Sequence, residues 1–98
     1  MSQDLYQLAI DGRTMCEENW TDLQEACKAV STACNVLSAA QVACSLTLCR
    51  TVIPGTVISL VETIIEFELR GDGSFETIER NVVMNDFGQY VMVAGGTL

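Results

Sequence analysis

The 98-residue chain contains no histidine, one proline and one lysine. Histidine is the residue that most often acts as a general acid or base and as a nitrogen ligand for metals, so its absence removes much of enzyme chemistry. Five Lys and Arg stand against thirteen Asp and Glu, and the formal net charge of −8 makes the chain repel phosphate. We therefore expect no enzyme activity, no cofactor and no nucleic-acid partner.

Charged residues are also scarce, at 18%, whereas hydrophobic residues make up 49% of the chain. This composition excludes the profile of disordered chains, and it indicates either a surface with few charges or a surface that is partly covered. The first residues, MSQDLY, contain no basic region followed by an apolar core. We therefore expect no secretory signal and a reducing, cytoplasmic location.

A stripe of cysteine and aliphatic residues at alternating spacings of four and three runs from Cys16 to Leu48. This spacing is typical of one face of an amphipathic helix. A helix over residues 16–48 would be about 50 Å long at 1.5 Å per residue, too long for a compact domain unless it is broken or packs against another chain. The stripe residues that we expect at an interface are Trp20, Leu23, Cys27, Val30, Cys34, Leu37, Gln41 and Leu48.

Local signals are consistent with two helices in this half of the chain. Thr14 and Glu17 stand three residues apart, as in a capping box, and predict the start of the long helix. We expect that helix to end near residue 50, before Pro54 biases the chain away from helix. A shorter helix is expected to begin after Ser2 and to end before Gly12.

The second half of the chain changes to a period of two. Ile65, Phe67 and Leu69 alternate with charged residues, as in a half-buried strand, and Gly71-Asp72-Gly73 provides a turn. Residues 56–62 fit either a strand or a helix face. The ranges expected to form strands are 65–70, 75–80, 82–84 and 89–94.

Together these patterns predict an α+β fold in a single domain over residues 1–98. One short helix and one long helix with a Cys/Ala/Leu stripe would occupy residues 1–50. A three- to four-stranded antiparallel β-meander would follow over residues 56–98.

The five cysteines raise metal or redox chemistry as an alternative. Cys27 and Cys34 are seven residues apart, or about 10 Å along one helix, which is too far for a disulfide or a shared ion. A Cu(I) or zinc site would therefore need Cys27, Cys34 and Cys44 to meet cysteines of another helix or chain. Buried cysteine otherwise behaves as a small hydrophobic residue, and packing is the role that we expect.

Residues 29–49 carry no charge and are long enough to span a bilayer. Asn35, Gln41 and several hydroxyl side chains dilute the hydrophobicity of this segment, and no aromatic belt flanks it. We therefore expect no membrane partner, and a small membrane protein stays an alternative.

The leading functional hypothesis is a non-catalytic, self-associating structural or adaptor module that is a small component of a larger assembly. Its partner would be another copy of the chain or an assembly protein. The spacings of four and three also form a heptad repeat, in which Trp20, Cys27, Cys34, Gln41 and Leu48 occupy the first, or a, positions. Gln41 is the polar residue among them, and it would set the register through hydrogen bonds to a partner helix. The alternatives are a thiol-based Cu(I)- or zinc-binding protein and a small membrane protein.

Overall fold

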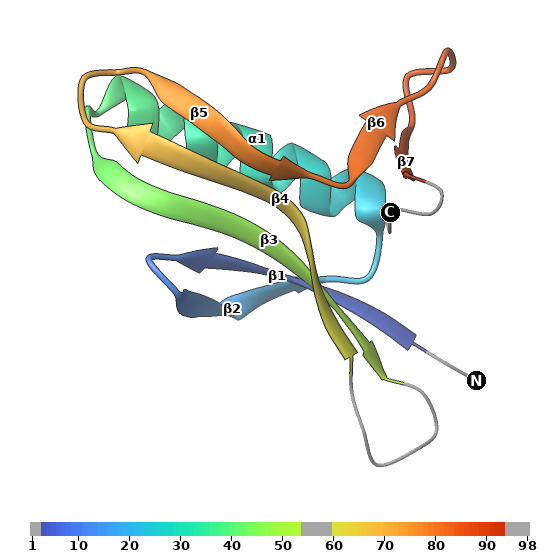
Figure 1. Ribbon diagram of the computed structural model, residues 1–98. Coiled ribbons are helices and arrows are strands. Elements are labelled where there is room, and N and C mark those ends of the chain that lie inside the picture. Colours follow the sequence, from blue (N-terminus) through green and yellow to red (C-terminus); the bar gives the residue numbers. More distant parts are fainter. Residues whose placement is uncertain (1–2, 54–59, 94–98) are drawn as a thin grey trace.

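The computed structural model describes residues 3–53 and 60–93. In this part of the chain one helix packs across one face of a five-stranded antiparallel sheet, and a separate two-stranded hairpin extends from one end (Figure 1). The predicted order, helices first and a meander second, is therefore wrong. The elements are β1 (Gln3–Ile10), β2 (Arg13–Trp20), α1 (Leu23–Ala39), β3 (Ala43–Ile53), β4 (Leu60–Arg70), β5 (Phe75–Arg80), β6 (Val82–Met84) and β7 (Tyr90–Met92).

The strands of the large sheet have the order β2-β1-β3-β4-β5, so β3 lies at the centre. On one side of β3, Leu48 pairs with Leu8 of β1, and on the other side it pairs with Ile65 of β4. Strands β2 and β5 form the two edges. Helix α1 connects β2 to β3 and packs mainly on β3, with further contacts to β1, β2 and β4.

A hairpin of β1 and β2 stands where the short first helix was predicted. Tyr6 and Leu8 are buried and Ile10 is half-buried, so apolar side chains follow the period of two that places them on one face of a strand. Asp11 and Gly12 form the turn with φ values of 52° and 78°. Two successive positive φ values are the requirement of a type I′ hairpin turn, which Asp-Gly satisfies well.

Asp11 also fastens this turn to the central strand. Its backbone N–H donates to the carbonyl of Ser45 at 2.8 Å, and its Oδ1 accepts from the Ser45 N–H at 2.9 Å. Thr14 and Glu17, the expected capping box, lie within β2. That prediction is wrong because strand pairing with β1 satisfies the backbone of this segment.

The helix itself is shorter than predicted. It begins after Asp22, whose carboxylate accepts the N–H of Glu25 at 3.2 Å, and it ends at Ala39. Residues 16–20 and 43–48, the two ends of the predicted helix, lie in β2 and β3.

The chain reverses from α1 into β3 through a left-handed residue, Gln41, at φ 56°. The N–H of Gln41 donates to the carbonyl of Ser38, and the N–H of Val42 donates to that of Leu37, both at 3.0 Å. This pair of hydrogen bonds is a Schellman motif, which terminates a helix. Gln41 is exposed at that position, and it is not the buried polar residue of a helical seam.

Replacing Gln41 by glycine should stabilise the protein by about 0.5–1 kcal/mol. A residue with a Cβ atom is strained at a left-handed φ, whereas glycine is not. Urea denaturation of the unmodified chain and of Gln41→Gly measures the difference. Gln41→Leu is the control, since it keeps the Cβ atom and should bring no such gain. A Gln41→Gly variant no more stable than Gln41→Leu would contradict the assignment.

Strand β3 takes the place of the second part of the predicted helix. Cys44, Leu46 and Leu48 are buried and alternate with half-buried Ser45 and Thr47. The uncharged segment 29–49 is therefore divided between a helix and a strand. Within residues 3–53 and 60–93, no helix has both the length and the apolar character that crossing a bilayer demands.

In the second half of the chain the predicted strands occur, but they do not form one meander. β4 and β5 pair across the turn 71–73 and continue the large sheet, whereas β6 and β7 pair only with each other. Of the ambiguous segment 56–62, residues 60–62 belong to β4. Residues 56–59 and Pro54, before which the long helix was expected to end, lie outside the described residues.

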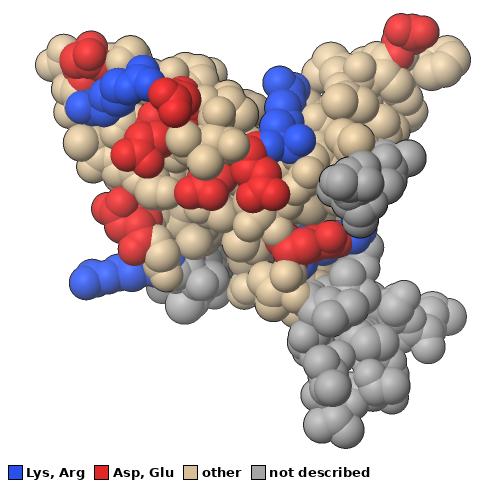
Figure 2. Space-filling model, in the orientation of Figure 1, with Lys and Arg blue, Asp and Glu red and all other residues tan. Residues whose placement is uncertain are grey.

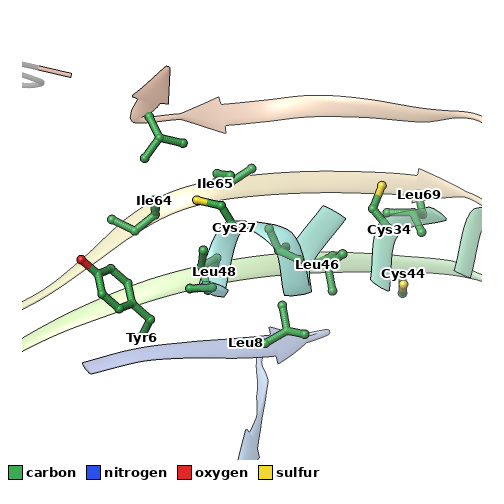
Figure 3. Packing of buried hydrophobic residues seen from close by; sticks show 13 residues of the cluster. Tyr6, Leu8, Cys27, Cys34, Cys44, Leu46, Leu48, Ile64, Ile65 and Leu69 are labelled. Atoms are coloured by element: carbon green, nitrogen blue, oxygen red, sulfur yellow. The ribbon is translucent and has the colours of Figure 1, made fainter. Parts of the chain in front are cut away.

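The hydrophobic core lies between α1 and the sheet (Figure 3). Small and medium side chains of α1 face the larger aliphatic side chains of β3 and β4, so the helix lies close to the strands. Burial of each large aliphatic side chain contributes about 1.5–3 kcal/mol. The buried residues are Tyr6, Leu8, Ala26, Cys27, Val30, Cys34, Cys44, Leu46, Leu48, Ile64, Ile65, Leu69 and Val82.

Candidate functional site

The structure places most of the predicted interface residues inside one copy of the chain. The centre of the stripe packs against the protein's own sheet, which accounts for its apolar character without a second chain. Cys27, Val30, Cys34 and Leu48 are buried together in the core, Trp20, Leu23 and Leu37 are half-buried at its margin, and Gln41 is exposed apart from them.

Cys27, Cys34 and Cys44 do not gather into a cluster. The described residues contain no group of three or more Cys, Asp or Glu side chains placed to hold a metal ion. Burial raises the pKa of Cys27 to about 11, and burial, followed by the Asp11 carboxylate and Cys34, raises the pKa of Cys44. These thiols are therefore protonated at neutral pH, whereas metal binding and nucleophilic attack require the thiolate.

Alkaline solution should destabilise the fold through Cys27. Its pKa is higher in the folded protein, about 11, than the ordinary value of 9.0 in the unfolded chain. Between pH 9 and pH 11 the Cys27 thiol loses its proton in the unfolded chain but keeps it in the folded protein. The free energy of unfolding therefore falls as the pH rises through this range. Urea denaturation at pH 8 and pH 11 should show a loss about 2 kcal/mol larger for the unmodified chain than for Cys27→Ala. Equal losses for the two proteins would contradict the shift.

Acidic side chains gather over β4 and β5 on the sheet face turned away from α1 (Figure 2). Glu66 pairs directly with Glu79, and Glu68 pairs directly with Glu76. Like charges directly opposite each other on neighbouring strands repel, and the ion pair of Glu76 with Arg70 relieves this only in part. This face therefore disfavours contact with a second copy of itself.

The β6–β7 hairpin, residues 82–93, contrasts with this acidic face because its only charged residue is Asp86. The hairpin projects from the body of the molecule and is largely uncharged (Figures 1 and 2). Phe87 at its tip is 86% exposed. The other exposed large hydrophobic residues of the hairpin are Val83, Met84, Val91 and Val93.

The tip of the hairpin is organised by Asn85. Its Oδ1 accepts the backbone N–H groups of Phe87 and Gln89, both at 2.9 Å. The carbonyl of Asn85 accepts the N–H of Gly88, which has a left-handed φ of 74°. These hydrogen bonds fix the backbone of the turn with the Phe87 side chain exposed to solvent. Little backbone conformational entropy therefore remains to be lost on binding.

The base of the hairpin is attached to the body on both sides. The Gln24 side chain at the start of α1 donates to the carbonyl of Tyr90 and accepts its N–H, both at 2.7 Å. Asn81 donates its N–H to Ile64 of β4 at 2.7 Å and accepts the N–H of Val93 at 3.0 Å. These hydrogen bonds fix the hairpin relative to both α1 and the sheet.

Gln24→Ala should loosen the hairpin without unfolding the protein. The N–H of Tyr90 would lose its acceptor, and a hydrogen bond of about 1 kcal/mol corresponds to roughly fivefold faster amide exchange. Gln24→Glu is the matched control, since it retains an acceptor for this N–H and should retain more of the protection. Unchanged exchange at Tyr90 in Gln24→Ala, measured by NMR, would show that the contact does not hold the hairpin.

A groove with a volume of about 610 Å³ lies between α1 and the β1–β2 hairpin. Its apolar lining includes Leu8, Ile10 and Trp20 from the sheet and Ala33, Val36 and Leu37 from α1. Glu25, Lys28 and Thr32 are exposed along the helix side of the groove and supply its polar atoms. Two predicted interface residues, Trp20 and Leu37, therefore do border a concave surface, although no continuous helix brings them there.

No family model, curated protein or solved structure matches the chain. Phe87 was not among the predicted interface residues. The available signal was a large aromatic residue within the turn Asn85-Asp86-Phe87-Gly88, where small and polar residues are the rule.

Proposed function

We propose that this chain is a non-catalytic, self-associating structural or adaptor module, and that the β6–β7 hairpin is its contact element. The observation that carries the proposal is Phe87, which is 86% exposed on a turn that Asn85 holds in one conformation. A large aromatic side chain in this position is a typical binding anchor, because its burial releases much apolar surface from water.

The surroundings of Phe87 support the same proposal. Its neighbours Val83, Met84 and Val91 are also exposed, and the hairpin carries a single charge. Exposed apolar patches on soluble domains mark interaction sites, and a rigid patch loses less conformational entropy on binding than a mobile one. The acidic face of β4 and β5 has the opposite character, which favours the hairpin over the sheet as the contact.

The thiol-based alternative receives less support from the geometry. Burial raises the pKa of four cysteine thiols, which keeps them protonated, and the same four thiols are free: Cys27, Cys34, Cys44 and Cys49. Free thiols fit the reducing, cytoplasmic location that we propose. The net charge of −8 supports a protein partner over nucleic acid.

Sedimentation equilibrium over a concentration series tests the proposal. We expect the unmodified chain to associate at micromolar concentration and Phe87→Ser to weaken association at least tenfold, or about 1.4 kcal/mol. The matched control is Val61→Ser, because Val61 is an exposed valine on β4, 66% exposed, away from the hairpin. Its association should equal that of the unmodified chain.

Two results would contradict the proposal. An unmodified chain that remains monomeric at several hundred micromolar would exclude self-association as its role. Equal association constants for Phe87→Ser and the unmodified chain would exclude the hairpin as the contact element.

A further inference from the structure

We infer that the groove between α1 and the β1–β2 hairpin receives the β6–β7 hairpin of a second copy of this chain, with Phe87 as the inserted anchor. The inference rests on the proposed function and names the partner of its contact element. It joins two surfaces of one molecule that have matching character: a protruding apolar tip and a concave apolar groove.

The groove fits Phe87 in its size and in its apolar lining. The groove has a volume of about 610 Å³, within the range of about 300–1,000 Å³ that is usual for pockets enclosing compact ligands. Its apolar walls include Trp20 of β2 and Val36 of α1, and Val36 is 61% exposed. A phenylalanine buries roughly 150–250 Å² when enclosed, so Phe87 and its neighbours can cover this exposed surface.

The groove and the hairpin tip also carry side chains of opposite charge. Lys28, the only lysine of the chain, borders the groove, and within the described residues it has no ion-pair partner. Asp86, the only charged residue of the hairpin, directly precedes Phe87. Glu25 lies on the same side of the groove as Lys28, so the attraction depends on Asp86 reaching the lysine when Phe87 is inserted. Such pairing at the rim orients a contact more than it strengthens it.

The hairpin cannot occupy the groove of its own chain. Gln24 and Asn81 fix its base, and its tip projects away from α1 and the sheet (Figure 1). The groove lies on the side of α1 that faces β1 and β2. Tip and groove therefore meet only between two copies, and every copy offers one of each. Such a head-to-tail contact forms a closed ring where the rotation closes and a linear chain where it does not.

A mixing experiment tests the inference directly. Phe87→Ser removes the anchor and leaves the groove intact, whereas Val36→Glu places a charge in the groove and leaves the hairpin intact. Each variant alone should lose at least tenfold in its association constant. An equimolar mixture should regain one good contact and form a species with one chain of each variant, which native mass spectrometry identifies by its mass. Ala33→Trp, which fills the groove, should behave like Val36→Glu.

The outcomes separate this inference from the proposed function. Loss of association in Phe87→Ser, with unaltered association in both Val36→Glu and Ala33→Trp, would overturn the groove as the receptor and leave the hairpin as the contact element. A mixture that stays monomeric would also overturn the inference. An unmodified chain that is itself monomeric would overturn both.

A charge exchange provides an independent check of the orientation. Lys28→Glu should weaken association about threefold at low salt, and adding Asp86→Lys in the same chain should restore it. The control is the double variant Lys28→Glu with Glu68→Lys, which has the same formal charge as Lys28→Glu with Asp86→Lys. Its new lysine lies on the acidic sheet face, so it should not restore association. Equal recovery with both second substitutions, or no weakening by Lys28→Glu, would overturn the pairing of these two residues.

Discussion

The contact between α1 and the central strand β3 holds the two layers of this protein together. Leu46 and Leu48 of β3 are fully buried beneath Cys27 and Val30 of the helix, whose modest size lets the backbones lie close. The position of the helix then determines both the groove and the placement of the β6–β7 hairpin. One side of α1 borders the groove with β1 and β2, and its first turn carries Gln24, which holds the β6–β7 hairpin.

The helix-like stripe was misleading at its ends for a specific geometric reason. Cys44 and Leu48 are four residues apart, and side chains at that spacing share a face in a strand as well as in a helix. Leu46 distinguishes the two, since it points with them in a strand and away from them in a helix. The Asp11-Gly12 pair likewise indicated a hairpin in place of a helix end, because both residues accept positive φ. The local sequence therefore indicates strand β3 and the β1–β2 turn. The strand order, by contrast, depends on pairing between distant segments.

The candidate site was less predictable than the strands that build it. Val83 and Val91 lie where alternation predicts strands, and their exposure follows only from the fact that no other element among residues 3–53 and 60–93 covers that side of the hairpin. Gln24 and Tyr90 are 66 residues apart, and no local pattern predicts their pair of hydrogen bonds. Trp20 and Leu37 were named from the helical stripe as residues of an interface between chains, which stays a prediction, and their common groove is a product of the tertiary fold.

The pairing of β1 with β3 has a consequence for how the chain folds. Leu8 lies opposite Leu48, so this ladder closes a loop of about 40 residues, at an entropic cost of about 3 kcal/mol. The β1–β2 hairpin and the β3–β4–β5 segment, by contrast, each form from neighbouring sequence. During synthesis β1 has no β3 partner until residues 46–53 have emerged. We expect the docking of these two local units across α1 to be the slow step of folding, because it is the non-local one.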